Sequence, residues 1–188
     1  IVSENKNKVI IRTTADILEC WAPNSDQISV NMGIPGLNWQ EIPLLEETNS
    51  ENISLHGYHF FCVNMGNPHA VTYIKEPLSD ETFFEIGPKV ERNALFPEKT
   101  NVEFSQIISD DLIEVRVWER GAGETLACGT GACAVGVSAI KQGLVKSDEV
   151  KIRFKGGDLI IHWPYSNEGK SAKVTMTGDY KVIKNGTI

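Results

Sequence analysis

The segment from Cys128 to Gly143 constrains the fold more than any other part of the chain. It is small or apolar almost throughout and ends in Lys-Gln-Gly, a pattern that predicts a helix over about 128–142 with Gly143 at its end. Each glycine inside a helix costs about 1 kcal/mol relative to alanine, so helix propensity alone would not form this helix. A helix that is apolar on every side is usually buried, and small side chains let strands approach its backbone. We therefore expect a central helix wrapped by a strongly curved sheet.

The other segments predict mainly strands, which makes the fold class α+β with a mixed or antiparallel sheet. A meander of three strands is expected at 8–14, 17–21 and 28–32. Residues 33–52 are rich in turn formers and are expected to connect two domains. Ser79 can cap a short helix. Further strands are expected at 58–63, 70–74, 101–108, 112–119, 150–155, 158–163, 174–177 and 180–183.

The composition is that of an ordinary globular chain. Its 188 residues are 41% hydrophobic and 23% charged, which allows one large domain or two small ones. A net charge of −7 without a cluster of Lys and Arg argues against binding to nucleic acid or a membrane surface. Since no apolar run reaches about 18 residues, we expect no membrane-spanning helix.

The cysteines indicate free thiols in a reducing cytoplasm. They form no Cys-x-x-Cys pair, and the four histidines form no His-x-x-x-His pair on a helical stretch, so we expect no metal site. The four cysteines are Cys20, Cys62, Cys128 and Cys133.

Cys128 is the candidate chemical group because it opens the predicted helix. The free N–H groups and the dipole of a helix N-terminus favour an anion, which predicts a lowered pKa for this thiol. The N–H groups of Gly129 and Thr130 can also receive a carboxylate. Just upstream, Arg120 offers a planar fork to a second carboxylate and Glu119 can accept an ammonium group. The region could therefore hold a thiolate and a zwitterionic amino acid, although a buried cysteine that only packs remains an open alternative.

Two further segments carry polar candidates. Pro68 fixes a turn in which Asn67 can present its amide at a strand end, and His69 follows as an acid, base or pKa modulator. Asn101 opens another predicted strand. Taken alone, each segment is better explained as a plain turn than as part of a site.

Four sequence motifs resemble landmarks of the diaminopimelate epimerase family, in the family's order. Residues 118–134, WERGAGETLACGTGACA, closely resemble its second catalytic-cysteine signature. Residues 66–71 (GNPHAV), 100–104 (TNVEF) and 176–178 (MTG) resemble the other three. The resemblance extends from about Ile10 to the end of the chain.

This resemblance implies a cofactor-independent epimerase that interconverts LL- and meso-diaminopimelate, a small-molecule substrate of the lysine and peptidoglycan pathway. It also implies a homodimer, and two pseudo-symmetric domains with the active site between them. Cys128 would be a catalytic cysteine that accepts a proton in one direction and donates it in the other. His69 and Glu119 would tune the cysteines. The residues that would contact substrate are Asn67, Asn101, Glu119, Arg120, Gly129 and Thr130.

One family feature has no counterpart in the sequence. The other catalytic cysteine of the family lies in a Gly-Asn-Gly-x-Arg-Cys motif, which does not occur here. Cys133 cannot replace it, since it lies about 140° around the helix from Cys128. We therefore expect the first-domain helix upstream of Ile1, with 1–32 and 174–188 as strands of that first domain and 33–173 as the second domain. The chain alone is predicted to be inactive.

Three alternatives stay open at this point. Isomerases similar to proline racemase or to phenazine-biosynthesis proteins share the general fold, although Glu119 and Arg120 favour the diaminopimelate branch. The chain could also be a non-catalytic amino-acid-binding or oligomerisation module. A redox role that pairs Cys128 with Cys133 is disfavoured by helix geometry.

Overall fold

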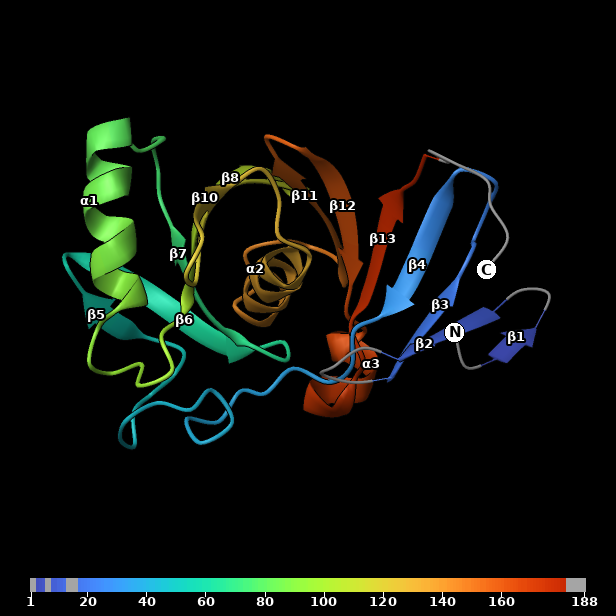
Figure 1. Ribbon diagram of the computed structural model, residues 1–188, viewed down its shortest axis with the longest axis horizontal. Helices are drawn as coiled ribbons and strands as arrows, with labels where there is room; N and C mark the ends of the chain where they lie inside the picture. The colour runs from blue at the N-terminus through green and yellow to red at the C-terminus, as the bar shows by residue number, and fades with distance from the viewer. Residues whose placement is uncertain (1–2, 6–7, 13–16, 182–188) are drawn as a thin grey trace.

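A single curved sheet surrounds one buried helix in the computed structural model, which describes residues 3–5, 8–12 and 17–181. Figure 1 shows this helix, α2 (Gly129–Lys141), viewed nearly end-on beneath an arch of strands. The other helices are α1 (Asp80–Glu91), which lies outside the arch, and α3 (Tyr165–Glu168), which a 3₁₀ turn (Gly169–Ser171) follows. The α+β fold with a wrapped central helix is thus confirmed.

Thirteen strands in the described residues form the sheet, in the order β1-β2-β3-β4-β13-β12-β11-β9-β8-β7-β6-β5, with β10 paired to β9 off this path. Most pairs are antiparallel, whereas β7–β8 and β9–β11 are parallel. The strands are β1 (Ser3–Asn5), β2 (Lys8–Arg12), β3 (Ile17–Trp21), β4 (Gln27–Asn31), β5 (Ile53–Leu55), β6 (Tyr58–Asn64), β7 (Pro68–Tyr73), β8 (Asn101–Ser109), β9 (Leu112–Glu119), β10 (Gly123–Thr125), β11 (Glu149–Phe154), β12 (Gly157–His162) and β13 (Thr175–Asp179).

The predicted meander corresponds to β2, β3 and β4, and the turn-rich segment after it contains neither helix nor strand. The end of the predicted strand 8–14 lies outside the described residues. The predicted strand at 180–183 is wrong for Tyr180 and Lys181, which follow β13 without strand structure, and its last two residues are outside the described part. The short elements β5, β10 and α3 were not predicted.

Strand β13 joins two groups of strands that are far apart in sequence. It pairs with β12 on one side and with β4 on the other, where Thr177 lies opposite Ser29. The hydroxyl groups of these two residues are 2.8 Å apart. The strands of the first 32 residues therefore continue the sheet that surrounds α2.

The small residues of α2 allow the close approach that the sequence predicted. All residues from Gly131 to Ile140 are buried, and a Cβ on Gly136 would lie 2.6 Å from Cγ2 of Ile161 on β12. The helix ends as expected, because Gly143 adopts a φ of 66° and the Leu144 N–H donates to the Ala139 carbonyl. None of the helices in the described residues has the length and apolarity of a membrane span.

Helix α1 packs on the opposite face of the sheet and begins as predicted, with the Ser79 side chain accepting a hydrogen bond from the Thr82 N–H. Its Phe83 lies in a second core with Phe104 of β8. Strand β8 is consequently covered by α1 on one face and by α2 on the other, so that Asn101 to Ser105 are all buried. A polar side chain in this strand is therefore held in a fixed, solvent-poor position.

Candidate active site

The parallel pairing of β7 with β8 brings two of the predicted polar segments together. His69 lies opposite Asn101 in this register, and the Asn101 side-chain amide donates to the Pro68 carbonyl over 2.9 Å. Strand β9 pairs with the other edge of β8, which places the end that carries Glu119 and Arg120 beside the same point. Three segments distant in sequence thus meet where the starts of β7 and β8 adjoin the end of β9.

Cys128 is the N-cap residue of α2. Its backbone is extended, with φ −139°, and its sulfur accepts a hydrogen bond from the Gly131 N–H at 3.3 Å. Because of their position, the N–H groups of Gly129 and Thr130 have no partner within the helix, and no backbone acceptor among the described residues takes their place. The free N–H groups expected at this end of the helix are therefore present, beside a thiol that is 8% exposed.

The predicted lowering of the Cys128 pKa is wrong for this structure. Burial, followed by the negative charge of Glu103, raises the pKa to about 11. The hydrogen bonds from the Thr130 hydroxyl and the Gly131 N–H lower it, but their effect is smaller. The helix terminus is thus outweighed by desolvation and by a carboxylate. At neutral pH this cysteine is a thiol.

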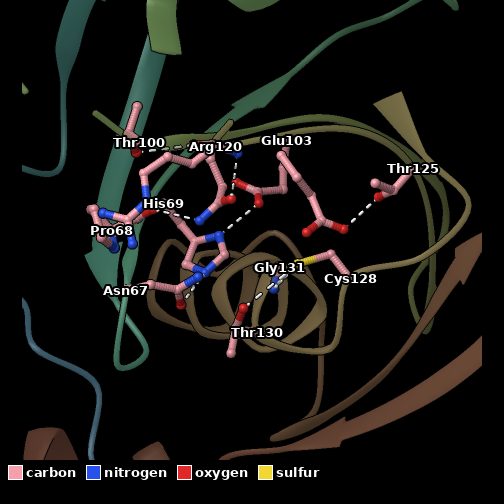
Figure 2. A network of polar contacts seen from close by, with 12 residues as sticks. Asn67, Pro68, His69, Thr100, Glu103, Arg120, Thr125, Cys128, Thr130 and Gly131 are labelled. Atoms are coloured by element: carbon pink, nitrogen blue, oxygen red, sulfur yellow. Dashed lines mark hydrogen bonds and ion pairs between the residues drawn. The ribbon is translucent and has the colours of Figure 1, made fainter. Parts of the chain in front are cut away.

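His69 is fully buried and is held at both ring nitrogens. Its Nδ1 lies 2.7 Å from Glu103 Oε1 and its Nε2 lies 2.9 Å from Asn67 Oδ1. Figure 2 shows the ring between these two side chains, beside the first turn of α2 with Cys128. Glu103 and Asn67 therefore fix the orientation of the ring from both sides.

Sequence reasoning did not select Glu103, although a signal existed. Glu103 lies two residues after Asn101 and between the apolar residues Val102 and Phe104, so Asn101 and Glu103 share one face of the sheet. A carboxylate at such a position is seldom buried without a function or a partner.

The start of β8 and the loop after α1 fix the position of Arg120. Its backbone N–H donates to Asn101 Oδ1 at 2.9 Å, and Nη1 of its exposed guanidinium donates to the Glu98 carbonyl at 3.0 Å. Buried Glu91 accepts hydrogen bonds from the Gly121 N–H at 3.0 Å and from Trp118 Nε1 at 2.8 Å, which holds the turn that follows.

Glu119 accepts a hydrogen bond from the Thr125 hydroxyl and lies close enough to Cys128 to raise its pKa slightly. The predicted site residues therefore gather in one region. The other three cysteines are buried free thiols. Burial raises the pKa of the Cys133 thiol. No group of three or more potential metal ligands occurs in the described part of the chain.

Two cavities, of about 350 and 450 Å³, lie elsewhere in the described structure. The first lies between Phe104, Arg116 and Phe154, and the second between Ile10, Ile17 and Lys173. Neither is lined by a candidate site residue, so Cys128 does not face either of these cavities.

Comparison with known proteins identifies the family. A sequence model described as diaminopimelate epimerase matches residues 61–183, more than half of the chain. The chain belongs to the diaminopimelate epimerase family. The motif resemblance that the sequence suggested is thereby confirmed.

Curated diaminopimelate epimerases are similar to nearly all of the chain. A protein of Methanococcus maripaludis strain C5 is 44% identical over 193 residues, which cover 98% of this chain and 68% of that protein. A protein of Caulobacter vibrioides is 41% identical over 184 residues, covering 94% and 62%. The chain thus spans about two thirds of the length of the diaminopimelate epimerases that it matches.

Solved structures share the fold at low sequence identity. A hydroxyproline epimerase from Agrobacterium vitis gives a TM-score of 0.60 at 16% identity, covering 95% of this chain and 58% of that one. A phenazine biosynthesis protein of the PhzF family from Bacillus anthracis gives 0.59 at 13% identity, covering 94% and 66%. At these identities the likeness concerns the fold alone. The sequence comparison places this chain with the diaminopimelate epimerases rather than with either of these groups.

Proposed function

We propose that this chain carries one half of the active site of a cofactor-independent epimerase that interconverts LL- and meso-diaminopimelate. The observation that carries the proposal is the position of Cys128 at the N-terminus of a buried helix, next to the unpaired N–H groups of Gly129 and Thr130. Family membership and the charged pair Glu119 and Arg120 nearby support the same substrate.

Substrate binding would use the charges in this part of the sheet. The two free N–H groups of α2 donate hydrogen bonds to the α-carboxylate, and the helix dipole also stabilises negative charge at this position. The Arg120 guanidinium binds a second carboxylate, and Glu119 accepts an ammonium group. Diaminopimelate carries two groups of each kind. Asn67 and Asn101 hold the loop and the strand end beside them.

The proton transfer requires an acid and a base on opposite faces of the α-carbon. A base removes the α-proton from one face, and the electron pair stays on carbon while the Cys128 thiol gives its proton to the other face. Cys128 is then a thiolate and accepts the α-proton in the reverse reaction. Fixed N–H dipoles at the carboxylate stabilise the developing negative charge. Glu119 and His69 adjust the environment of the sulfur.

The second base is proposed to come from another part of the protein. Cys62 and Cys133 are completely buried, and Cys20 lies in β3, remote from the site in the sheet order. We propose that 33–173 form the second domain and that β1 to β4, with β13, belong to the first, so that the substrate cleft forms between them. The homodimer and the cytoplasmic location stay predictions.

The decisive experiment measures epimerisation and α-proton exchange of LL- and meso-diaminopimelate in D₂O. A longer protein that contains this chain and the Gly-Asn-Gly-x-Arg-Cys motif is expected to be active, and Cys128→Ala should reduce turnover by at least about a thousandfold. Cys20→Ala is a matched control, since both thiols are 8% exposed, and it should retain activity. Activity retained in Cys128→Ala, or full epimerisation by the present chain alone, would contradict the two-cysteine mechanism.

A further inference from the structure

Glu103 is a carboxylate in the buried first half of β8, and only one of its oxygens has a partner among the described residues. The side chain has no exposed surface, and Oε1 pairs with His69 Nδ1. Oε2 is also buried, but it accepts no hydrogen bond among the described residues. Burying a charge costs several kcal/mol, roughly, unless it is paired and solvated by hydrogen bonds. A buried acceptor left open in this way requires an explanation.

Glu103 also adjoins the catalytic sulfur. A Cβ on Gly131 would stand 2.9 Å from Glu103 Oε1 and 3.2 Å from Cys128 Sγ. The carboxylate and the sulfur thus border the same small space, and glycine at 131 keeps that space free of a side chain. No side chain of the first helical turn separates the negative charge from the thiol at this point.

Among the described residues, few other charged groups lie next to Glu103 and Cys128. His69 of β7 forms the pair with Glu103 described above, and Glu119 at the end of β9 adds a second negative charge near Cys128. Cys62 of β6 and Cys133 of α2 are the other titratable groups close by, and both are buried thiols with raised pKa values. The Arg120 guanidinium binds the Glu98 carbonyl. Among the charged groups that act on the Cys128 sulfur, Glu103 therefore has the largest effect and Glu119 a smaller one.

We propose that Glu103 is a positioning residue that keeps the proton on Cys128 in the resting site and holds the His69 ring in place through its Nδ1. Cys128 then begins the reaction as the acid. The electrostatic effect of Glu103 on the pKa of Cys128 has the required sign. The catalytic consequence rests on the proposed epimerase function, whereas the protonation state of Cys128 does not.

The test measures the pH dependence of Cys128 alkylation by iodoacetamide, followed by peptide mass spectrometry, without substrate. In Glu103→Gln the midpoint should fall by about one pH unit, which corresponds to about tenfold faster alkylation below the midpoint. Glu103→Asp, which keeps the charge, should return the midpoint most of the way to that of the wild type. An unchanged midpoint in Glu103→Gln would overturn the proposal.

Glu91→Gln is the matched control, because Glu91 is an equally buried carboxylate that binds Gly121 and Trp118 instead. It should leave the midpoint of Cys128 in place, and an equal shift would mean that any buried carboxylate acts in this way. A measurement on the wild type covers the case in which Glu103→Gln does not fold. The alkylation midpoint of the wild-type Cys128 should lie above 9.0, the ordinary pKa of the thiol, and a midpoint at or below that value would refute the proposal.

The two proposals fail separately. If a longer, folded protein does not epimerise diaminopimelate, the proposed function fails while the alkylation result stands. If epimerisation is observed and the alkylation midpoint ignores Glu103, only the role of Glu103 is lost. In an active protein, Glu103→Gln should also lower the apparent pKa that the pH profile of kcat assigns to Cys128. A purely structural role would leave this apparent pKa unchanged.

Discussion

Asn101 and Arg120 are joined by a hydrogen bond that connects the start of β8 to the end of β9. The Asn101 oxygen accepts from the Arg120 N–H, while its nitrogen donates to the Pro68 carbonyl, each over 2.9 Å. The side chain is 3% exposed, so these internal bonds are its main interactions. Asn101 therefore fixes the distance between the Asn67 loop and Arg120, and a direct contact with substrate stays a prediction.

Replacing Asn101 by alanine should destabilise the fold by about 2 kcal/mol, because a buried N–H and a buried carbonyl lose their partners. Urea unfolding of the two chains measures the difference. Asn24→Ala is the control, since Asn24 is exposed and bonds only to the nearby Gln27 and Asp26. Its effect should stay within about 0.5 kcal/mol. Equal stability of Asn101→Ala and the wild type would exclude the bridging role.

Alanine at Gly136 should destabilise the chain by about 1–3 kcal/mol through overpacking, despite alanine's better helix propensity. The added methyl group would stand 2.6 Å from Ile161 Cγ2. Thermal or urea unfolding checks this, with Ile161→Ala as the second half of a double-mutant cycle. The double variant should be less destabilised than the sum of the single variants, and strict additivity would argue against the contact.

Glu124 should make the chain sensitive to acid. Hydrogen bonds from Arg116 and Lys155 lower its pKa from 4.5 to about 2. Its charge therefore stabilises the fold above pH 4.5, and this contribution disappears as the pH falls towards 2. In Glu124→Gln the loss at pH 7 should be about 1 kcal/mol, reduced by solvent screening, and should vanish near pH 2.

Urea unfolding at several pH values between 7 and 2 measures this effect. Glu47→Gln provides the control, since Glu47 is exposed, and its effect should stay within about 0.5 kcal/mol at every pH. A loss in Glu124→Gln that is the same at pH 7 and near pH 2 would contradict the assignment.

Arg120→Lys tests the proposed carboxylate fork in an active, longer protein. Lysine retains the charge and the backbone N–H bond to Asn101 but loses the planar pair of donors. KM for diaminopimelate should rise about tenfold, while the unfolding temperature stays within a few degrees. Arg153→Lys is the control, since that half-buried arginine pairs with Asp158 rather than with a candidate site residue and should leave KM unchanged. An unchanged KM in Arg120→Lys would remove it from the binding site.

The central helix could be predicted from the sequence because glycine and alanine are so unusual on every side of a helix that burial is the simplest physical explanation. The alternating strands of the meander were accessible for a similar reason. Strands of three residues, such as β5 and β10, carry too few positions to show a period. Sequence alone also does not fix the register of a parallel pair, which is what places His69 opposite Asn101.

The pKa of Cys128 shows why site chemistry is harder to predict than site membership. The sequence placed the thiol at a helix N-terminus, and the structure agrees. The sign of the shift depends on burial and on Glu103, which lies on another element and reaches the sulfur only through tertiary packing. A local motif contains no information on the burial of the sulfur or on its distance from Glu103.

The position of β13 between β4 and β12 has a consequence for how the chain is made. Ser29 pairs with Thr177, which lies 148 residues further along the chain. During synthesis the early meander leaves the ribosome with the edge of β4 open, and that edge stays unpaired until β13, the last of the described strands, has emerged. In ribosome-bound nascent chains that stop before Thr175, the meander should accordingly remain undocked from the rest of the sheet and accessible to chaperones and proteases.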